Sequence, residues 1–135
     1  MTRLPDWLDR LHAYVENVRH QPFNIIEHSC ALFAAGCIEA VSGERADQVL
    51  GVSVRSERDV LRVLEQFAGV KGLAQRYFGS PMRPPRTARR GDVVIRPGEH
   101  GDTLGVCMGD HALFLSRDGL QPRRLRECAG CWRVG

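Results

Sequence analysis

A change of pattern beyond the middle of the chain constrains the fold more than any other feature. Before residue 80 apolar residues recur at helical spacing, and after residue 91 they fall in short runs separated by turns. Residues 80–91 lie between these regions and have three prolines in five residues, which favours an extended, stiff connection. Helices followed by strands predict an α+β fold, with N-terminal helices packed on a C-terminal antiparallel β-sheet.

The most apolar helix is expected to begin near residue 30. Ala31–Val41 mixes small and large apolar side chains with one charge, Glu39, which is typical of a helix buried on nearly all sides. Ser29 is the expected N-cap, which places Cys30 in the first turn. Apolar periodicity and start signals predict further helices over residues 7–18, 56–67 and 73–78.

Four short β-type runs are expected after the proline-rich segment. They cover residues 92–95, 103–108, 112–116 and 131–134, and glycine-containing turns separate them. The chain has 135 residues, 43% of them apolar, which suffices for one core but not for two. We therefore expect residues 1–135 to form a single domain.

The composition argues against several classes of protein. Charged residues make up 26% of the chain, so disorder is not expected. The longest apolar stretch, residues 31–41, is shorter than the roughly 20 residues that span a bilayer. Arginines and aspartates occupy the start, where a secretory signal would be apolar. Five cysteines, an odd number, argue against a complete disulfide framework and indicate a reducing site of synthesis.

Cys30 is the first candidate for catalysis. The N-terminus of a helix favours the thiolate, which is the form of cysteine that attacks carbonyl groups. His28 lies two residues upstream and is expected to point elsewhere, because residues at that separation do not share a helix face. The alternative is that Cys30 is a small apolar residue packed at a helix start.

The chain resembles the NlpC/P60-type cell-wall peptidases, and more closely their small relatives encoded among phage tail genes. The resemblance spans nearly the whole chain and rests on short motifs: Trp7 with Leu11 and Tyr14, Phe23 with Cys30–Ala35, Arg90–Val94, Leu104–Val106 with Gly109, and Trp132–Val134. It implies a papain-like fold. It also implies a place in the virion, at the tail tip or baseplate, after synthesis in the cytoplasm of the bacterial host.

The resemblance implies that Cys30 stands at the nucleophile position. The position at which the family has its catalytic base, a histidine, is occupied here by Thr103, which cannot accept a proton near neutral pH. The motif before the cysteine also differs from the acidic or tryptophan-containing one that is usual in the family, and reads Glu27-His28-Ser29. Two other histidines could replace the base. His100 lies in a glycine-flanked loop, and His111 lies near the start of the third strand, where the resemblance expects a polar residue that orients the base.

Cys128 and Cys131 form a C-x2-C pair, which is half of a zinc or iron–sulfur site. No second such pair exists, so a metal would need Cys107, Cys37, Cys30 or His111 as a further ligand. The alternatives are a redox disulfide, or Cys131 packed in the core with Cys128 in a loop. No metal or cofactor is expected.

Lys71 is the only lysine among 19 basic residues, and arginines cluster near residues 83–90 and 123–126. These clusters could bind nucleic acid or anionic cell-wall polymers. No aromatic interleaving or recognition helix accompanies them, so a solvated or protein-contacting face is expected, with no nucleic acid partner.

Three functions follow from these features. The leading expectation is a structural component of a phage tail tip or baseplate with a degenerate cell-wall-peptidase fold, whose partners are other tail or baseplate proteins. The first alternative is an active peptidoglycan cysteine endopeptidase that aids genome delivery. The second is a metal- or cluster-binding tail adaptor built around Cys128 and Cys131.

Overall fold

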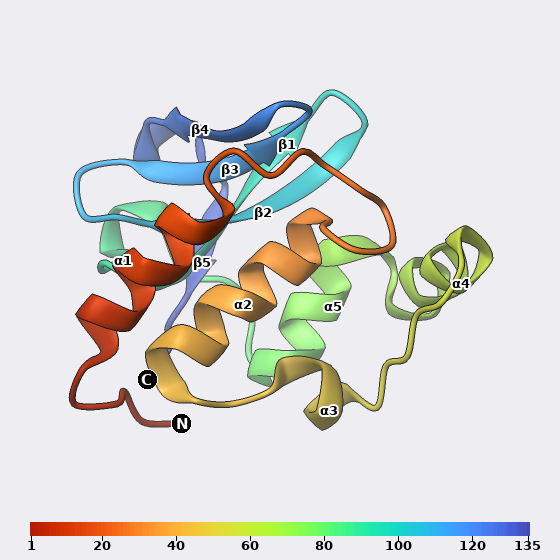
Figure 1. The fold of residues 1–135 in the computed structure, drawn as a ribbon, viewed down its shortest axis with the longest axis horizontal. Coiled ribbons are helices and arrows are strands. Elements are labelled where there is room, and N and C mark those ends of the chain that lie inside the picture. Colours follow the sequence, from red (N-terminus) through yellow and green to blue (C-terminus); the bar gives the residue numbers. More distant parts are fainter.

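A five-stranded antiparallel sheet organises the C-terminal half of the molecule. The structure is a computed structural model that describes residues 1–135. The strands are β1 (Val93–Gly98), β2 (Gly101–Cys107), β3 (Ala112–Ser116), β4 (Gly119–Arg123) and β5 (Gly130–Trp132), in the order β4-β3-β2-β1-β5. Strands β1 to β4 form a meander, and β5 returns to pair with β1 at the opposite edge (Figure 1).

Five helices form the N-terminal half: α1 (Trp7–Val18), α2 (Cys30–Ser42), α3 (Ala46–Leu50), α4 (Glu57–Phe67) and α5 (Gly69–Phe78). The predicted helices all form, and the last begins at Gly69, earlier than expected. Helix α3 was not predicted, because only five residues are helical there. Strand β4 was not predicted either. Its Pro122 is compatible with strand structure because β4 lies at the edge of the sheet.

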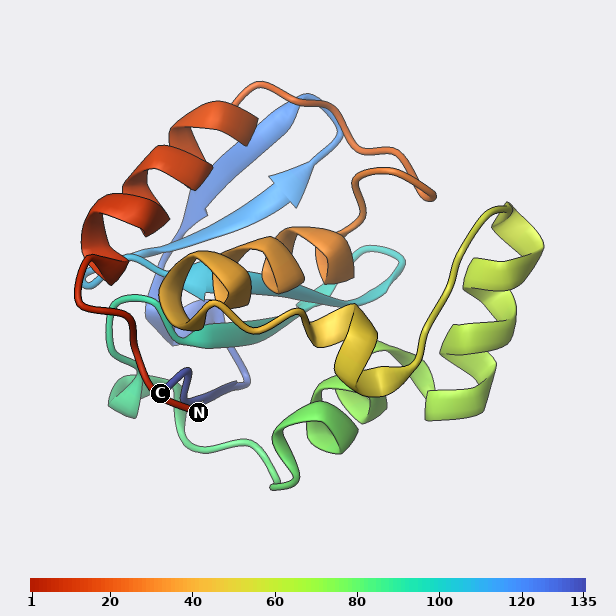
Figure 2. The same cartoon turned by 60° about the horizontal axis from the view of Figure 1, so that its bottom comes forward.

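The main core lies between the helices and one face of the sheet. Alternate positions of β1 and β2, Val93 with Ile95 and Leu104 with Val106, point into this core and meet α1, α2 and α5. Figures 1 and 2 show α2 running across this face, with its first turn toward the β1–β2 hairpin. The predicted α+β class, with N-terminal helices packed on a C-terminal antiparallel sheet, is confirmed.

The other face of the sheet is covered by loops rather than helices. Two short 3-10 helices, η1 (Pro85–Thr87) and η2 (Leu125–Glu127), lie in these loops. A second, smaller core forms beneath them from six buried residues: Val94, Cys107, Ala112, Phe114, Cys128 and Cys131. The proline-rich segment therefore includes one 3-10 turn instead of being extended throughout.

Helix α4 projects from the body of the molecule (Figure 2). It is strongly amphipathic, yet none of its residues is buried. Ser56 caps it as predicted, because its hydroxyl accepts a hydrogen bond from the amide of Asp59 at 3.2 Å. No helix in the structure has the length and apolarity needed to cross a bilayer.

Candidate functional site

Cys30 is the first residue of α2. Ser29 has an extended backbone (φ −96°, ψ 173°) and its hydroxyl accepts a hydrogen bond from the amide of Leu32 at 3.3 Å. Ser29 is thus the N-cap, as predicted from the sequence. Cys30 is half-exposed, whereas the other four cysteines are buried. The structure therefore holds one accessible thiol at the positive end of a helix dipole.

The Cys30 side chain continues the buried stripe of α2. Residues four, seven and eleven positions further along, Ala34, Cys37 and Val41, are buried in the main core, and Cys30 packs against the same core. Because residues at this spacing share one face of a helix, Cys30 lies at the solvent end of the face that packs on the sheet. Packing alone therefore explains a small side chain here.

Thr103, the position at which the resemblance expects a base, lies on the other face of the sheet. It pairs with Arg96, and it alternates with Leu104, whose side chain enters the main core. The Arg96 guanidinium lies over the ring of Phe114, on the face away from the helices, with its carbon 5.6 Å from the ring centroid. This position of β2 thus differs from the expected base both in residue type and in the face that it occupies.

His111 precedes β3 and is exposed in part. Its Nδ1 lies 2.6 Å from Oδ1 of Asp110, so its nearest partner is a neighbouring surface carboxylate. This contact holds the pKa of Asp110 below its usual value. Nothing in this arrangement orients the imidazole toward a thiol.

A series of hydrogen bonds places His111 at the far end of α2. Arg90 donates from Nε to the carbonyl of Met108, three residues before His111, at 2.9 Å. Arg3 donates from Nη1 to the carbonyl of Arg90 at 2.7 Å. The amide of Leu4, the next residue, donates to the carbonyl of Val41 in the last turn of α2 at 2.8 Å. Helix α2 has 13 residues and is about 20 Å long, so the structure does not bring His111 and Cys30 together.

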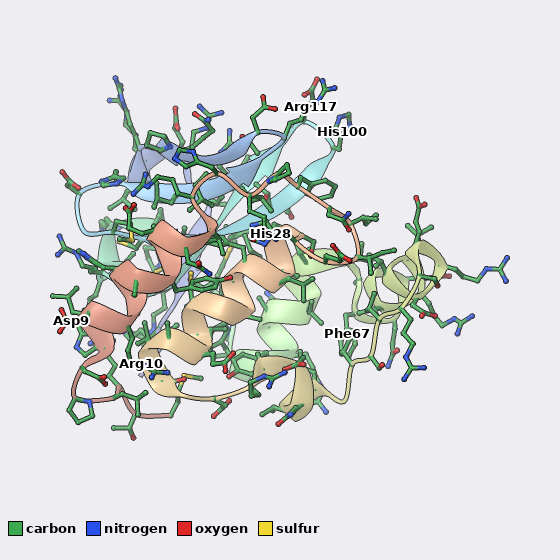
Figure 3. All side chains as sticks on the ribbon, in the orientation of Figure 1. Asp9, Arg10, His28, Phe67, His100 and Arg117 are labelled. Atoms are coloured by element: carbon green, nitrogen blue, oxygen red, sulfur yellow. The ribbon has the colours of Figure 1, made fainter.

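His100 lies in the turn between β1 and β2 and is exposed. Figure 3 shows it at the outer tip of this hairpin, away from His28. It has neither a hydrogen-bond nor an ion-pair partner that would hold the imidazole over α2.

His28 is the histidine that sequence reasoning set aside, and it is buried, with 4% of its surface exposed. Its ring meets Phe33 edge to face, with centroids 6.4 Å apart. Its Nε2 is buried and has no hydrogen-bond partner. Burial lowers the pKa of His28, so the neutral imidazole is favoured.

A compact loop places His28 beneath the start of α2. The side-chain oxygen of Asn24 accepts hydrogen bonds from the amides of Ile26 and Glu27, both at 2.9 Å. The backbones of Asn24 and His28 also bond to each other in both directions. Asn24, four residues before His28, is the sequence signal that could have identified this turn.

An apolar cavity of about 100 Å³ lies beside Cys30, between α2, α3, α5 and the sheet. Asp47 is the only polar residue in its lining, and alanines provide much of the space. The cavity begins at Ala31 and Leu32, which follow Cys30 directly. Its apolar members include Ala31, Leu32, Ala35, Leu50, Leu73 and Tyr77. The part of the lining next to Cys30, Ala31 and Leu32, is apolar and offers no proton acceptor, and Asp47 belongs to the part beyond the other end of α2.

Three cysteines lie in the small core on the other face of the sheet. Burial raises the pKa of Cys107 and Cys131, and raises the pKa of Cys128 to about 11. The thiol of Cys131 donates to the carbonyl of Pro84 at 3.4 Å. No group of three or more histidine, cysteine, aspartate or glutamate side chains in the structure is arranged to hold a metal ion. Cys128 and Cys131 therefore gain no further ligand from the fold.

Comparison with curated proteins and with solved structures finds no match. A family model described as a domain of unknown function (DUF6950) matches residues 2–134. The match covers both the helices and the sheet, including Cys30 and His28. The chain therefore belongs to the DUF6950 family.

Proposed function

We propose that this chain is a structural component of the tail tip or baseplate of a bacteriophage. In this proposal its fold is a degenerate form of the papain-like NlpC/P60 peptidase design, and its partners are other tail or baseplate proteins. The particle assignment rests on the sequence resemblance, which runs from Trp7 to Val134. The loss of peptidase chemistry rests on the geometry around Cys30.

One observation carries the non-catalytic part of the proposal. The strand positions that face α2 at the start of β2 are Asp102 and Leu104, and neither supplies an imidazole. Thr103 lies on the opposite face, and His111 lies at the far end of α2. Loss of a general base costs about 10²–10⁴ in rate. Cys30 then remains as a packed helix-start residue.

Purified particles test both parts of the proposal. The protein is expected among the particle proteins by mass spectrometry, and a genome with Cys30→Ala is expected to give the same titre. Asp92→Asn serves as the comparison, because it weakens the fold and should reduce incorporation. Absence from the particle would exclude the structural role. Loss of infectivity in Cys30→Ala, with normal incorporation, would exclude the non-catalytic role.

A specific observation favours a second function, that of a peptidoglycan endopeptidase with Cys30 as nucleophile. His28 is buried, its pKa is lowered, and its Nε2 has no hydrogen-bond partner, the Cys30 thiol included. A neutral imidazole is the form that accepts the proton of a thiol. The His28 ring contacts Phe33. Phe33 is three residues from Cys30, so Phe33 and Cys30 lie on the same side of α2. In this case Cys30→Ala and His28→Ala would both abolish cleavage, whereas His100→Ala and His111→Ala would leave it unchanged.

A further inference from the structure

Charge is divided unevenly between the two halves of the chain. Residues 1–68 have seven basic and ten acidic side chains, and residues 69–135 have twelve basic and six acidic ones, which together give the net charge of +3. The first segment builds α1 to α4, and the second builds α5, the sheet and its covering loops. The sheet side of the molecule is therefore positive, and most of the helical side is weakly negative.

The arginines of the second segment gather on the face of the sheet away from the helices. Arg123 pairs with Ala112 in the register of β3 and β4, and Ala112 belongs to the small core on that face. Arg83 bridges to Cys131, another member of this core. We name six exposed side chains the arginine face: Arg83, Arg86, Arg123, Arg124, Arg126 and Arg133.

None of these six guanidinium groups takes part in an ion pair within the chain. Glu127 is the only acidic residue in residues 81–91 and 121–135. Its carboxylate accepts a hydrogen bond from the amide of Arg124 at 3.2 Å. The positive charge of the arginine face is therefore left uncompensated by the fold.

Prolines lie among the arginines and stiffen the backbone that presents them. Pro122 precedes Arg123 in β4, but it pairs with Leu113 of the main core and so lies on the helix side of the sheet. Pro81 and Pro84 are exposed in the segment that carries Arg83 and Arg86. They add rigid apolar surface that loses little conformational entropy on docking, and guanidinium groups bind carboxylates through paired donors. No large aromatic side chain is exposed here on which a base could stack, and no α-helix covers this face to enter a nucleic acid groove.

We propose that the arginine face docks a carboxylate-rich segment or surface of a partner protein. The proposal rests on the structural role argued above and names the chemistry of one partner of that role. Charge complementarity carries it, because six unpaired guanidinium groups with interleaved prolines match an acidic protein surface. Binding through such a face is fast and is weakened by salt.

A fluorescent peptide of twenty glutamates is the probe, with binding to the full chain followed by fluorescence anisotropy. The double variant Arg124→Glu/Arg126→Glu is expected to bind at least about tenfold more weakly than the wild type. Arg55→Glu/Arg58→Glu is the matched control, because it makes the same change of charge at exposed positions near and on α4 and should bind nearly as the wild type does. Both variants are expected to keep the wild-type melting temperature.

Three results would overturn the proposal. The first is no binding of the glutamate peptide at low salt, and the second is equal loss in both double variants. The third is tighter binding of a duplex DNA with the same number of negative charges, which would assign the face to nucleic acid. These results leave the particle assignment intact, since mass spectrometry of purified particles tests that separately.

Discussion

The guanidinium of Arg3 donates from Nη2 to Oδ1 of Asp92 at 3.1 Å, and this pair ties the start of the chain to the start of the sheet. Asp92 is fully buried. Its Oδ1 also accepts the amide of Val134 at 3.0 Å, and its Oδ2 accepts the amide of Arg89 at 2.9 Å. One carboxylate thus joins both ends of the chain to the segment that precedes β1.

Asp92→Asn is predicted to lower the free energy of unfolding by about 3–5 kcal/mol. The change removes the charge that compensates Arg3 and replaces one acceptor oxygen with a donor. Urea unfolding followed by circular dichroism measures the loss. Asp118→Asn, at an exposed turn carboxylate without an ion pair, is the control and should shift stability by less than about 0.5 kcal/mol. A similar small shift for Asp92→Asn would show that the clamp does not stabilise the fold.

Gly105→Ala is predicted to destabilise the protein by about 1–3 kcal/mol. An added Cβ would lie 2.6 Å from Cδ1 of Phe114 and would also collide with the carbonyl oxygen of Leu113. Thr103→Ala, two residues away on the same strand and face, should cost less because it only removes atoms. Thermal unfolding of both variants decides this prediction, and a wild-type melting temperature for Gly105→Ala would refute it.

His28 is predicted to make stability depend on pH. Burial lowers its pKa in the folded state, while the unfolded chain binds the proton near the ordinary value of about 6.5. The stability contributed by the neutral, buried imidazole is therefore complete above about pH 6.5, and it is lost as the pH falls toward the lowered pKa of the folded state. Between pH 8 and pH 5 the wild type should lose more stability than His28→Phe. His100→Phe, at an exposed site, should behave as the wild type does.

Native cysteines are predicted to differ sharply in reactivity. Only Cys30 is half-exposed, and burial raises the pKa of Cys37, Cys107, Cys128 and Cys131. Brief treatment with iodoacetamide at pH 8 should label Cys30 first, and all five thiols should react in urea. Peptide mapping by mass spectrometry follows the labelling. Earlier labelling of Cys128 or Cys131 would contradict the buried placement of these thiols.

Local signals in the sequence were enough for the strongest elements. The Ser29 and Ser56 caps set the starts of α2 and α4, because each hydroxyl accepts a hydrogen bond from a first-turn amide that has no partner within the helix. Strand β4 escaped prediction because its residues, Gly119–Arg123, include a proline and charged or polar side chains. It forms because backbone pairing with β3 stabilises an edge strand that its own residues do not favour.

The site was harder to predict than the fold. The position of Cys30 followed from the cap, but the face of Thr103 depends on the β1–β2 register, which pairs Thr103 with Arg96. The burial of His28 depends on the Asn24 turn and on packing against Phe33, two contacts that residue spacing does not reveal. Whether His28 serves structure or chemistry is the point at which the two proposed functions differ.

Release of soluble peptides from purified host peptidoglycan, by wild-type protein and by Cys30→Ala, tests the loss of peptidase chemistry most directly. The geometry around Cys30 predicts that both proteins release only background amounts, because no imidazole faces the thiol from the sheet. Cys30→Ala removes one sulfur atom at the solvent end of the packed face of α2, so the variant is expected to fold as the wild type does. Peptide release by the wild type that disappears in Cys30→Ala would contradict the non-catalytic role.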